Sequence, residues 1–280
     1  MTVRAATGDD LPAVVALTRA QRSRLARWAP VYFNPAAQAD DLHAGYLGWL
    51  VSSADHDTRV VVDDGEVCAF AHVIEQGTHH WADDLCWVDG RGAAGLELLA
   101  SVEADAVATC VAAEDDESRS LLADHGFAVT SVYWSRPLDR DGASPPAVGA
   151  APRHPLPAPP LHTFGPIGPG DDGALTIAEA DSLVVGSPSV SPPIYDPGGP
   201  SCVIDRVLGP DRSGLVRAAM AEAAGRGDAQ MIVVVDADDD ELTDAVMAVG
   251  FVAQVQLLIR GASTAPSGGS DPGRTPRAGG

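Results

Sequence analysis

The pattern of hydrophobic and polar positions divides the chain into short strands and amphipathic helices. Apolar runs bounded by Gly, Pro or Asp are typical of strands, whereas apolar residues three or four positions apart are typical of helices. In a predicted helix over 36–53, Leu42, Tyr46, Trp49 and Leu50 lie on one side. The expected strands of the first part are 2–5, 59–62, 67–76, 81–89, 106–111 and 128–138, and its other expected helices begin near residues 9, 93 and 116.

The end of this pattern occurs twice. An apolar strand, an acidic turn, a short helix ending in Gly-Phe and a further strand run from Ala106 to Leu138, and again from Gln230 to Gly261. The copies align without a gap when Gly126 is placed on Gly250. A repeat of this length indicates duplicated architecture, and two copies are too few for a solenoid. The repeat therefore predicts two related α/β lobes.

Domain boundaries follow from the segments that lack periodicity. Residues 139–173 are rich in Pro, Ala and Gly, which is typical of a partly extended linker. Residues 262–280 lack apolar anchors, so we expect a disordered tail. We therefore expect a first domain over 1–138 and a partial, degenerate second domain over 174–261.

The amino-acid composition excludes some catalytic mechanisms and disfavours some classes of partner. All 18 basic residues are Arg, so the chain has no lysine for a Schiff base or a P-loop. The net charge of −21 disfavours nucleic acid as a partner and could attract a cationic amine. The four cysteines lack metal-ligand spacing, so we expect no metal site and free thiols in a reducing cytoplasm. We expect neither a signal peptide nor a membrane span, and the oligomeric state is open.

The order of elements resembles the GCN5-related N-acetyltransferase (GNAT) family. The opening VRAATGDDLPAVVALTRA and the helix ESRSLLADHGF are similar to the corresponding segments of that family. The resemblance covers residues 2–138 fully and about 174–261 in part. It implies an α/β fold with a mixed, mostly antiparallel sheet flanked by helices, duplicated as a second partial lobe.

The resemblance also implies acetyl-CoA as co-substrate, held where two neighbouring parallel strands diverge. Its pyrophosphate would lie on backbone N–H groups of a Gly-rich turn that opens a helix, because unpaired N–H donors and the helix dipole bind anions. The implied cofactor residues are Cys86, Trp87, Val88, Arg91, Gly92, Ala93, Ala94 and Gly95. Ala94 and Leu96 depart from the family's small-residue pattern, and a helix packed tightly on a strand explains this turn equally well. In the second lobe Asp211 would repel phosphate, so we expect no CoA there.

For catalysis, the resemblance implies an acidic base on or beside the central strand, and Asp83, Asp84 and Glu75 are the available carboxylates. Asp83 and Asp84 are equally consistent with a turn or a solvent-facing edge. The tyrosine that is often the family's general acid is replaced by Leu122 and, in the second copy, by Val246.

Several aromatic residues near this site have ordinary structural interpretations. His72, in an apolar strand, is typical of a hydrogen-bonded core histidine, and His79 and His80 are more typical of a loop than of metal ligands. The other aromatic residues are more typical of core than of a substrate clamp: Trp28, Tyr32, Phe33 and Trp49.

Two classes of function remain open at this point. The first is an N-acetyltransferase that moves an acetyl group from acetyl-CoA to an amine of a small molecule or peptide by direct attack. The alternative is a catalytically degenerate GNAT fold that serves as a binding or regulatory module. A third interpretation gives the second lobe only a structural role, in completing or shielding the sheet of the first.

Overall fold

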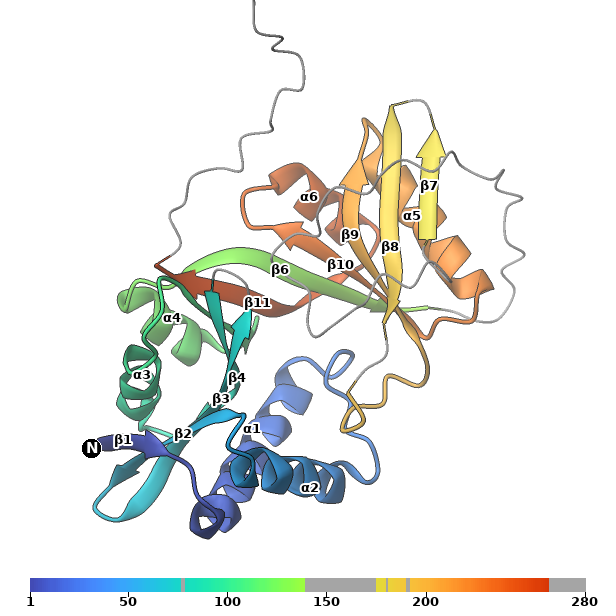
Figure 1. Cartoon of the computed structure of the whole chain (residues 1–280). Coiled ribbons are helices and arrows are strands. Elements are labelled where there is room, and N and C mark those ends of the chain that lie inside the picture. Colours follow the sequence, from blue (N-terminus) through green and yellow to red (C-terminus); the bar gives the residue numbers. More distant parts are fainter. Residues whose placement is uncertain (77–78, 139–174, 180, 190–191, 262–280) are drawn as a thin grey trace, which may run out of the picture.

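The computed structural model describes residues 1–76, 79–138, 175–179, 181–189 and 192–261 (Figure 1). The predicted linker at 139–173 and the predicted tail at 262–280 lie outside the described residues. Below, the first half means residues 1–138 and the second half means the described part of residues 175–261.

The first half contains every element that its sequence pattern predicts. Its helices are α1 (Leu11–Trp28), preceded by a 3-10 turn at Gly8–Asp10, α2 (Ala39–Ser52), α3 (Gly92–Ala100) and α4 (Asp116–Asp124). Its strands are β1 (Thr2–Ala5), β2 (Asp57–Asp63), β3 (Glu66–Gln76), β4 (His79–Trp87), β5 (Val107–Ala112) and β6 (Ala128–Pro137). Pro12 lies in the first turn of α1, where a missing N–H costs nothing. Gly126, with φ 82°, follows the end of α4 in the left-handed region that glycine favours.

The second half repeats this order without an opening strand and two helices. It consists of β7 (Leu175–Glu179), β8 (Ser182–Ser189), β9 (Ser201–Leu208), α5 (Arg212–Gly225), β10 (Gln230–Asp236), α6 (Asp240–Ala248) and β11 (Val252–Arg260). Asp115 caps α4 and Asp239 caps α6, each accepting a hydrogen bond from a backbone N–H three residues on. The repeat in the sequence is therefore a repeat of local structure.

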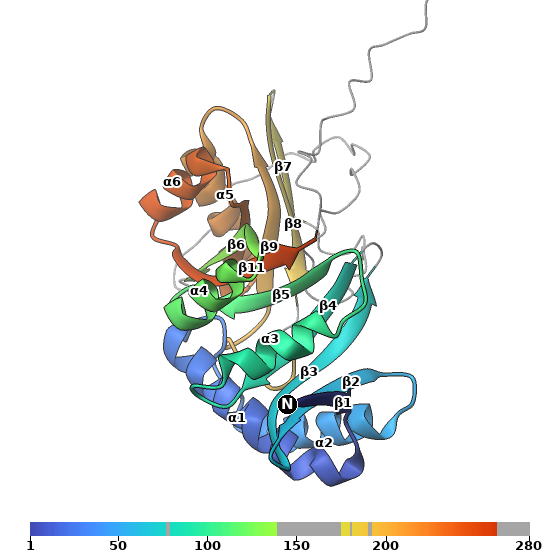
Figure 2. The same cartoon turned by 90° about the vertical axis from the view of Figure 1, so that its left-hand side faces the viewer.

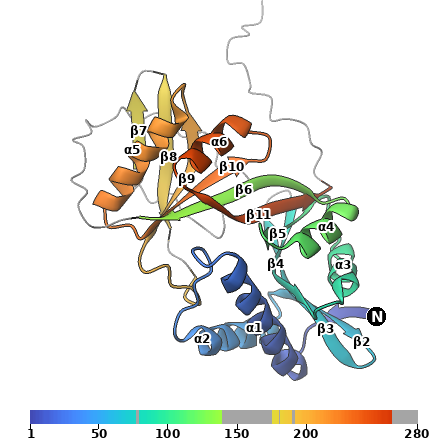
Figure 3. The same ribbon diagram turned by 180° about the vertical axis from the view of Figure 1, so that it is seen from behind.

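The two halves share one sheet of eleven strands because they exchange their last strands. The strand order is β1-β2-β3-β4-β5-β11-β6-β10-β9-β8-β7. β11 of the second half pairs with β5 of the first, and β6 of the first pairs with β10 of the second (Figures 1 and 3). When Gly126 is aligned with Gly250, Ala108 corresponds to Ile232 and Ser135 corresponds to Ile259. Ala108 opposes Ile259, and Ile232 opposes Ser135, so the two strand pairs have the same register.

The sheet is mixed and mostly antiparallel, as expected. In the described part of the chain, the parallel pairs are β4 with β5 and β9 with β10. These are the equivalent positions of the two halves, and each parallel pair is joined through a crossover helix.

Helices cover the two faces of the sheet unequally. α3 and α4 pack on one face of the first half, and α5 and α6 pack on the second half (Figures 2 and 3). α1 and α2 pack on the opposite face of the first half, over β2, β3 and β4. A further apolar cluster, which includes Phe33, Trp81, Tyr133 and Val203, spans both halves and joins them.

Two expectations about local structure are wrong. His79 and His80 belong to β4 and not to a loop. The stripe of α2 formed by Leu42, Tyr46 and Trp49 faces solvent, with exposed fractions of 45%, 40% and 54%. The buried residues of α2 are Ala39, His43, Leu47 and Leu50. Packing against α1, whose Val14 and Leu17 share an apolar cluster with Leu47 and Leu50, selected this second face, so an apolar stripe is left uncovered.

No helix among the described residues is both long enough and apolar enough to cross a membrane.

Candidate functional site

The centre of the first half is a gap between two parallel strands. β4 and β5 pair only at His80 with Val107 and at Trp81 with Ala108, and then diverge. Beyond this point lies a cavity of about 50 Å³. Its lining residues are Gln21, Arg24, Trp28, Leu85, Trp87, Asp89, Gly90, Cys110, Val111, Asp115, Glu117 and Ser118. The cavity is large enough for water but far below the roughly 300–1,000 Å³ of ordinary ligand pockets.

A β-bulge places both predicted carboxylates on one face of β4. The register of β3 against β4 shifts between Phe70 and His72, and Asp84 adopts φ 50°. An extra residue in one strand reverses the usual alternation of side chains. Asp83 lies opposite His72, and Asp84 contacts His43 of α2, so both carboxylates point toward α1 and α2. They occupy a strand, not the turn or edge that the sequence also allowed.

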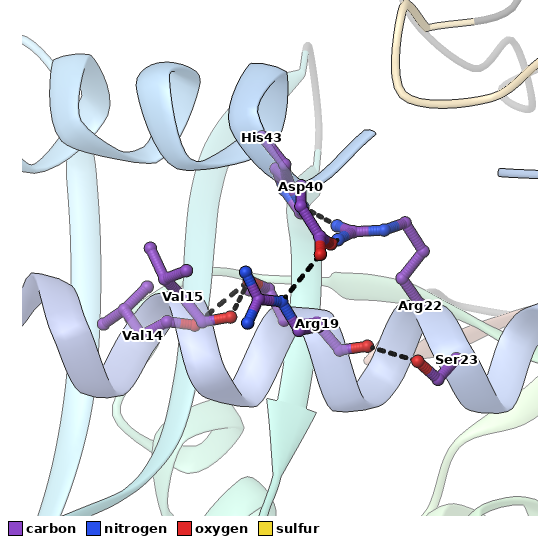
Figure 4. A network of polar contacts seen from close by, with 8 residues as sticks. Val14, Val15, Arg19, Arg22, Ser23, Asp40 and His43 are labelled. Carbon is purple, nitrogen blue, oxygen red and sulfur yellow. Dashed lines mark hydrogen bonds and ion pairs between the residues drawn. The ribbon is translucent and has the colours of Figure 1, made fainter. Parts of the chain in front are cut away.

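Asp84 is held by a buried polar network from the two helices. The Nε2 atom of His43 lies 3.1 Å from Oδ2 of Asp84, and Nη1 of Arg22 lies 2.6 Å from Nδ1 of His43. Arg22 also binds Asp40, which accepts a second contact from Arg19 at 3.1 Å (Figure 4). Because a guanidinium only donates, Nδ1 of His43 must accept, and its Nε2–H donates to Asp84. His43 is therefore a neutral orienting group for Asp84.

Asp83 has the properties of a proton acceptor. Burial and the neighbouring Asp84 carboxylate raise the pKa of Asp83 to about 6. A carboxyl group with a pKa near neutrality suits general-base catalysis. Glu75, the third predicted carboxylate, is exposed and lies opposite His80, on the other face of β3. The structure thus brings Asp83 and Asp84 together and leaves Glu75 apart.

The second half contributes a side chain to this site. The loop at 192–200 lies against the connection between α1 and α2, where Ala36 N donates to Ile194 O at 3.0 Å and Asp196 N donates to Asn34 O at 2.8 Å. These bonds place the ring of Tyr195 5.1 Å from that of Phe33. Burial and Asp84 raise the pKa of Tyr195 well above its usual value, so its hydroxyl stays protonated near the carboxylates.

The predicted cofactor turn is explained in part by packing. A Cβ at Gly92 would lie 2.5 Å from Leu121, and a Cβ at Gly95 would lie 2.3 Å from the Trp87 ring. Both glycines therefore let α3 approach α4 and β4 closely. The side chain of Arg91 points away from the gap and pairs with Asp63 at 2.9 Å. Ala94 and Cys86 are buried, whereas Ala93 and Val88 are exposed.

Some features of the turn nevertheless fit an acyl-CoA. No side chain caps the N-terminus of α3, so its first N–H groups are available to an anion. Arg24 of α1, which also lines the cavity, binds Asp89 and donates to the carbonyl of Trp87 at 3.4 Å. A cation therefore lies at the end of β4, beside the turn that precedes α3.

The equivalent turn of the second half is closed. Asp211 caps α5 by accepting a hydrogen bond from Gly214 N at 2.8 Å, and Arg212 links this end to Asp239 of α6. One N–H group that an anion would use, that of Gly214, is thus already bound, and a carboxylate occupies this turn. The absence of CoA from the second half stays a prediction.

Several site residues were not found from the sequence. Arg22 and His43 are polar residues on the buried faces of their helices. A polar residue at an otherwise apolar helix position was the signal in the sequence that could have identified them. No local pattern marks Tyr195, because the loop that carries it reaches the site only through tertiary contacts. His72 is buried as expected, but its Nδ1 has no hydrogen-bond partner among the described residues. Within the same described ranges, no three His, Cys, Asp or Glu residues are grouped to hold a metal ion.

Comparisons with known proteins support the fold. No family model and no curated protein matches the chain. Among solved structures, a Thermoplasma acidophilum protein with a provisional assignment as an acetyltransferase matches 92% of this chain and 99% of its own, with 13% identity and a TM-score of 0.52. A GCN5-related N-acetyltransferase from Sphaerobacter thermophilus matches 92% and 95%, with 17% identity and a TM-score of 0.49. The PaiA N-acetyltransferase of T. acidophilum, solved with coenzyme A, matches 46% and 89%, with 12% identity and a TM-score of 0.39.

The first of these similarities extends over both halves, and the mixed sheet and the gap between β4 and β5 are features that the sequence resemblance implied. The chain has the fold of the GCN5-related N-acetyltransferases, built as a tandem of two halves.

Proposed function

We propose that this protein is an acyltransferase that moves an acetyl group from acetyl-CoA to an amine. The observation that carries the proposal is the pair Asp83 and Asp84, placed by a bulge beside the gap between β4 and β5. The reaction needs a place for a thioester and a group that removes a proton from the attacking amine. The gap and the carboxylates supply these two requirements side by side.

The proposed cofactor residues would contact different parts of acetyl-CoA, according to their positions. The first N–H groups of α3, at Gly92 and Ala93, would face the pyrophosphate, with Ala94 and Gly95 continuing the turn. The strand end at Cys86, Trp87 and Val88 would run beside the thioester arm. Arg91 contributes its backbone, because its side chain is bound to Asp63. When bound, the cofactor supplies an activated acyl group.

The two carboxylates have different roles in this proposal. Asp84, oriented by His43, attracts the ammonium form of the acceptor. Asp83, whose pKa is raised to about 6 by burial and by Asp84, takes the proton, directly or through water. The protein contributes position and charge. The neutral amine would form the new C–N bond at the acyl carbon, the C–S bond of the thioester would break, and the second amine proton would pass to the leaving sulfur to give CoA thiol.

The thiols near the gap favour direct attack over an acyl-enzyme. Burial, reinforced by Asp84, raises the pKa of Cys86, and burial reinforced by Asp83 raises that of Cys110. A thiol is a nucleophile only as its thiolate. Neither cysteine is therefore activated to carry the acyl group.

Release of CoA thiol from acetyl-CoA, followed with a panel of primary amines, tests the function. We expect turnover above the blank with at least one amine. Turnover with none of them would favour the degenerate binding module, which the small cavity and the buried Leu122 at the usual place of the acid also favour.

A substitution of Arg24 tests the cofactor site. We expect Arg24→Ala to weaken acetyl-CoA binding about tenfold, because Arg24 lines the cavity and its removal would take away a charge-assisted contact to phosphate. The measurement is calorimetric titration of acetyl-CoA into the full chain. Arg91→Ala is the matched control and should change the dissociation constant less than twofold, since Arg91 is not among the residues that line the cavity and its side chain pairs with Asp63. The reverse order of effects would place the phosphates beside Arg91.

A further inference from the structure

A continuous series of five aromatic rings starts beside Asp84, follows α2 and ends in β3. His43 stacks on Tyr46 with centroids 6.4 Å apart, and Tyr46 lies 5.8 Å from Trp49. Trp49 contacts His56 edge-on at 4.3 Å, and His56 contacts His72 at 5.4 Å. The series begins at the residue bound to Asp84 and ends at the residue opposite Asp83.

Part of this series is open to solvent. Together with Leu42, the rings of Tyr46 and Trp49 form the uncovered stripe of α2 described above. Large apolar side chains that gather on one stripe beside a polar site mark a binding surface more often than singly scattered ones do. The side chain of Asp84 is also 24% exposed, and His43 links it to the stripe by contacting both Asp84 and the Tyr46 ring.

Charge decides what kind of molecule fits this surface. Burial, together with Asp83 and Asp84, raises the pKa of Tyr46 to about 12, so its ring lies in the field of both carboxylates. The chain as a whole carries −21. An anionic membrane or an acidic partner would be repelled here, whereas a cation would be attracted both by the carboxylates and by the faces of the aromatic rings.

We propose that the acceptor is a primary amine carried on a flat apolar or aromatic body. Its ammonium group lies at Asp84, and its body lies on the stripe of Leu42, Tyr46 and Trp49. This inference rests on the proposed function, since it names the amine that the transferase would acylate. It assigns Trp49, which the sequence analysis placed in the core, to substrate specificity.

The test is calorimetric titration of three probes into the full chain without any acyl donor. 2-Phenylethylamine has both the ammonium and the flat body, ethylamine lacks the body, and 3-phenylpropanoate reverses the charge. We expect 2-phenylethylamine to bind at least tenfold more tightly than ethylamine and 3-phenylpropanoate not to bind. Equal binding of the two amines, absence of binding by either, or binding of the anion would overturn the inference.

Variants locate the site. We expect Trp49→Ala to weaken binding of 2-phenylethylamine about tenfold and Asp84→Asn to weaken it at least as much. Met247→Ala, which removes a side chain of similar exposure (56%) on α6 of the other half, should leave it unchanged. Trp49 is exposed, so its replacement leaves the core intact, and no effect of Trp49→Ala would move the site elsewhere. Amine binding without release of CoA thiol would sustain the inference while contradicting acyl transfer.

Discussion

Removal of residues 139–280 is expected to leave the first half unable to fold as a monomer. Without β11, the strands β5 and β6 lose the partner that lies between them. The first half also loses Leu258, which packs in the core beneath α3 and α4, and Arg260, which lies 4.9 Å from the Phe127 ring and donates to the Leu99 carbonyl.

The expected loss is comparable to the stability of a domain. β11 buries four of its five large apolar side chains almost completely: Val255, Leu257, Leu258 and Ile259. At roughly 2 kcal/mol for each buried side chain, their removal costs about 8 kcal/mol, which lies within the 5–15 kcal/mol that typically stabilises a folded domain. Circular dichroism and light scattering of the fragment 1–138 provide the measurement. We expect an unfolded chain, an aggregate, or a dimer in which β6 of a second copy takes the place of β11.

The control for this deletion is a chain that ends at Gly261, which retains all described strands and should melt cooperatively. A fragment 1–138 that is monomeric and melts cooperatively would contradict the exchange of strands. It would mean that the second half is not part of the core of the first, against the interpretation in which the second lobe completes the sheet.

Replacement of Asp83 by Asn is expected to lower kcat/KM for acyl transfer by about 100-fold or more. Asn keeps the shape of the side chain but accepts no proton, and a positioned base typically contributes about 10²–10⁴-fold. In the unmodified protein, Asp83 is ionised above its pKa of about 6 and protonated below it. Activity should therefore fall about tenfold per pH unit below pH 6, and this acid limb should disappear in Asp83→Asn.

Asp205 provides a matched control within the same chain. Asp205 lies two residues after Val203 in β9, and Asp83 lies two residues after Trp81, the equivalent residue of β4. Burial raises the pKa of Asp205 to about 6 as well. The adjacent turn is capped by Asp211, so Asp205→Asn should change kcat/KM less than twofold. Equal losses in both variants would indicate a common structural role, and an acid limb that survives in Asp83→Asn would assign the base to another group.

The prediction of elements from the sequence succeeded because it used local signals. Periodicity, the acidic turns before α4 and α6, and the glycines after these helices act within a few residues of the chain. The prediction for α2 failed because two apolar stripes compete on that helix. One stripe includes His43. This polar residue can be buried with its stripe because Arg22 and Asp84 form hydrogen bonds with its two ring nitrogens.

By itself, the sequence determined the order of helices and strands, the duplication, the resemblance to acetyltransferases and the carboxylates that could act as base. The tertiary structure decided three things. Alternation along a strand would have put Asp83 and Asp84 on opposite faces, and only the bulge in β4 brings them together. The position of Tyr195 depends on a loop from the other half. The exchange of β6 and β11 could not be predicted because the two strands are copies of each other, so that either could pair with β5 or β10 and only the connections between the halves select the partner.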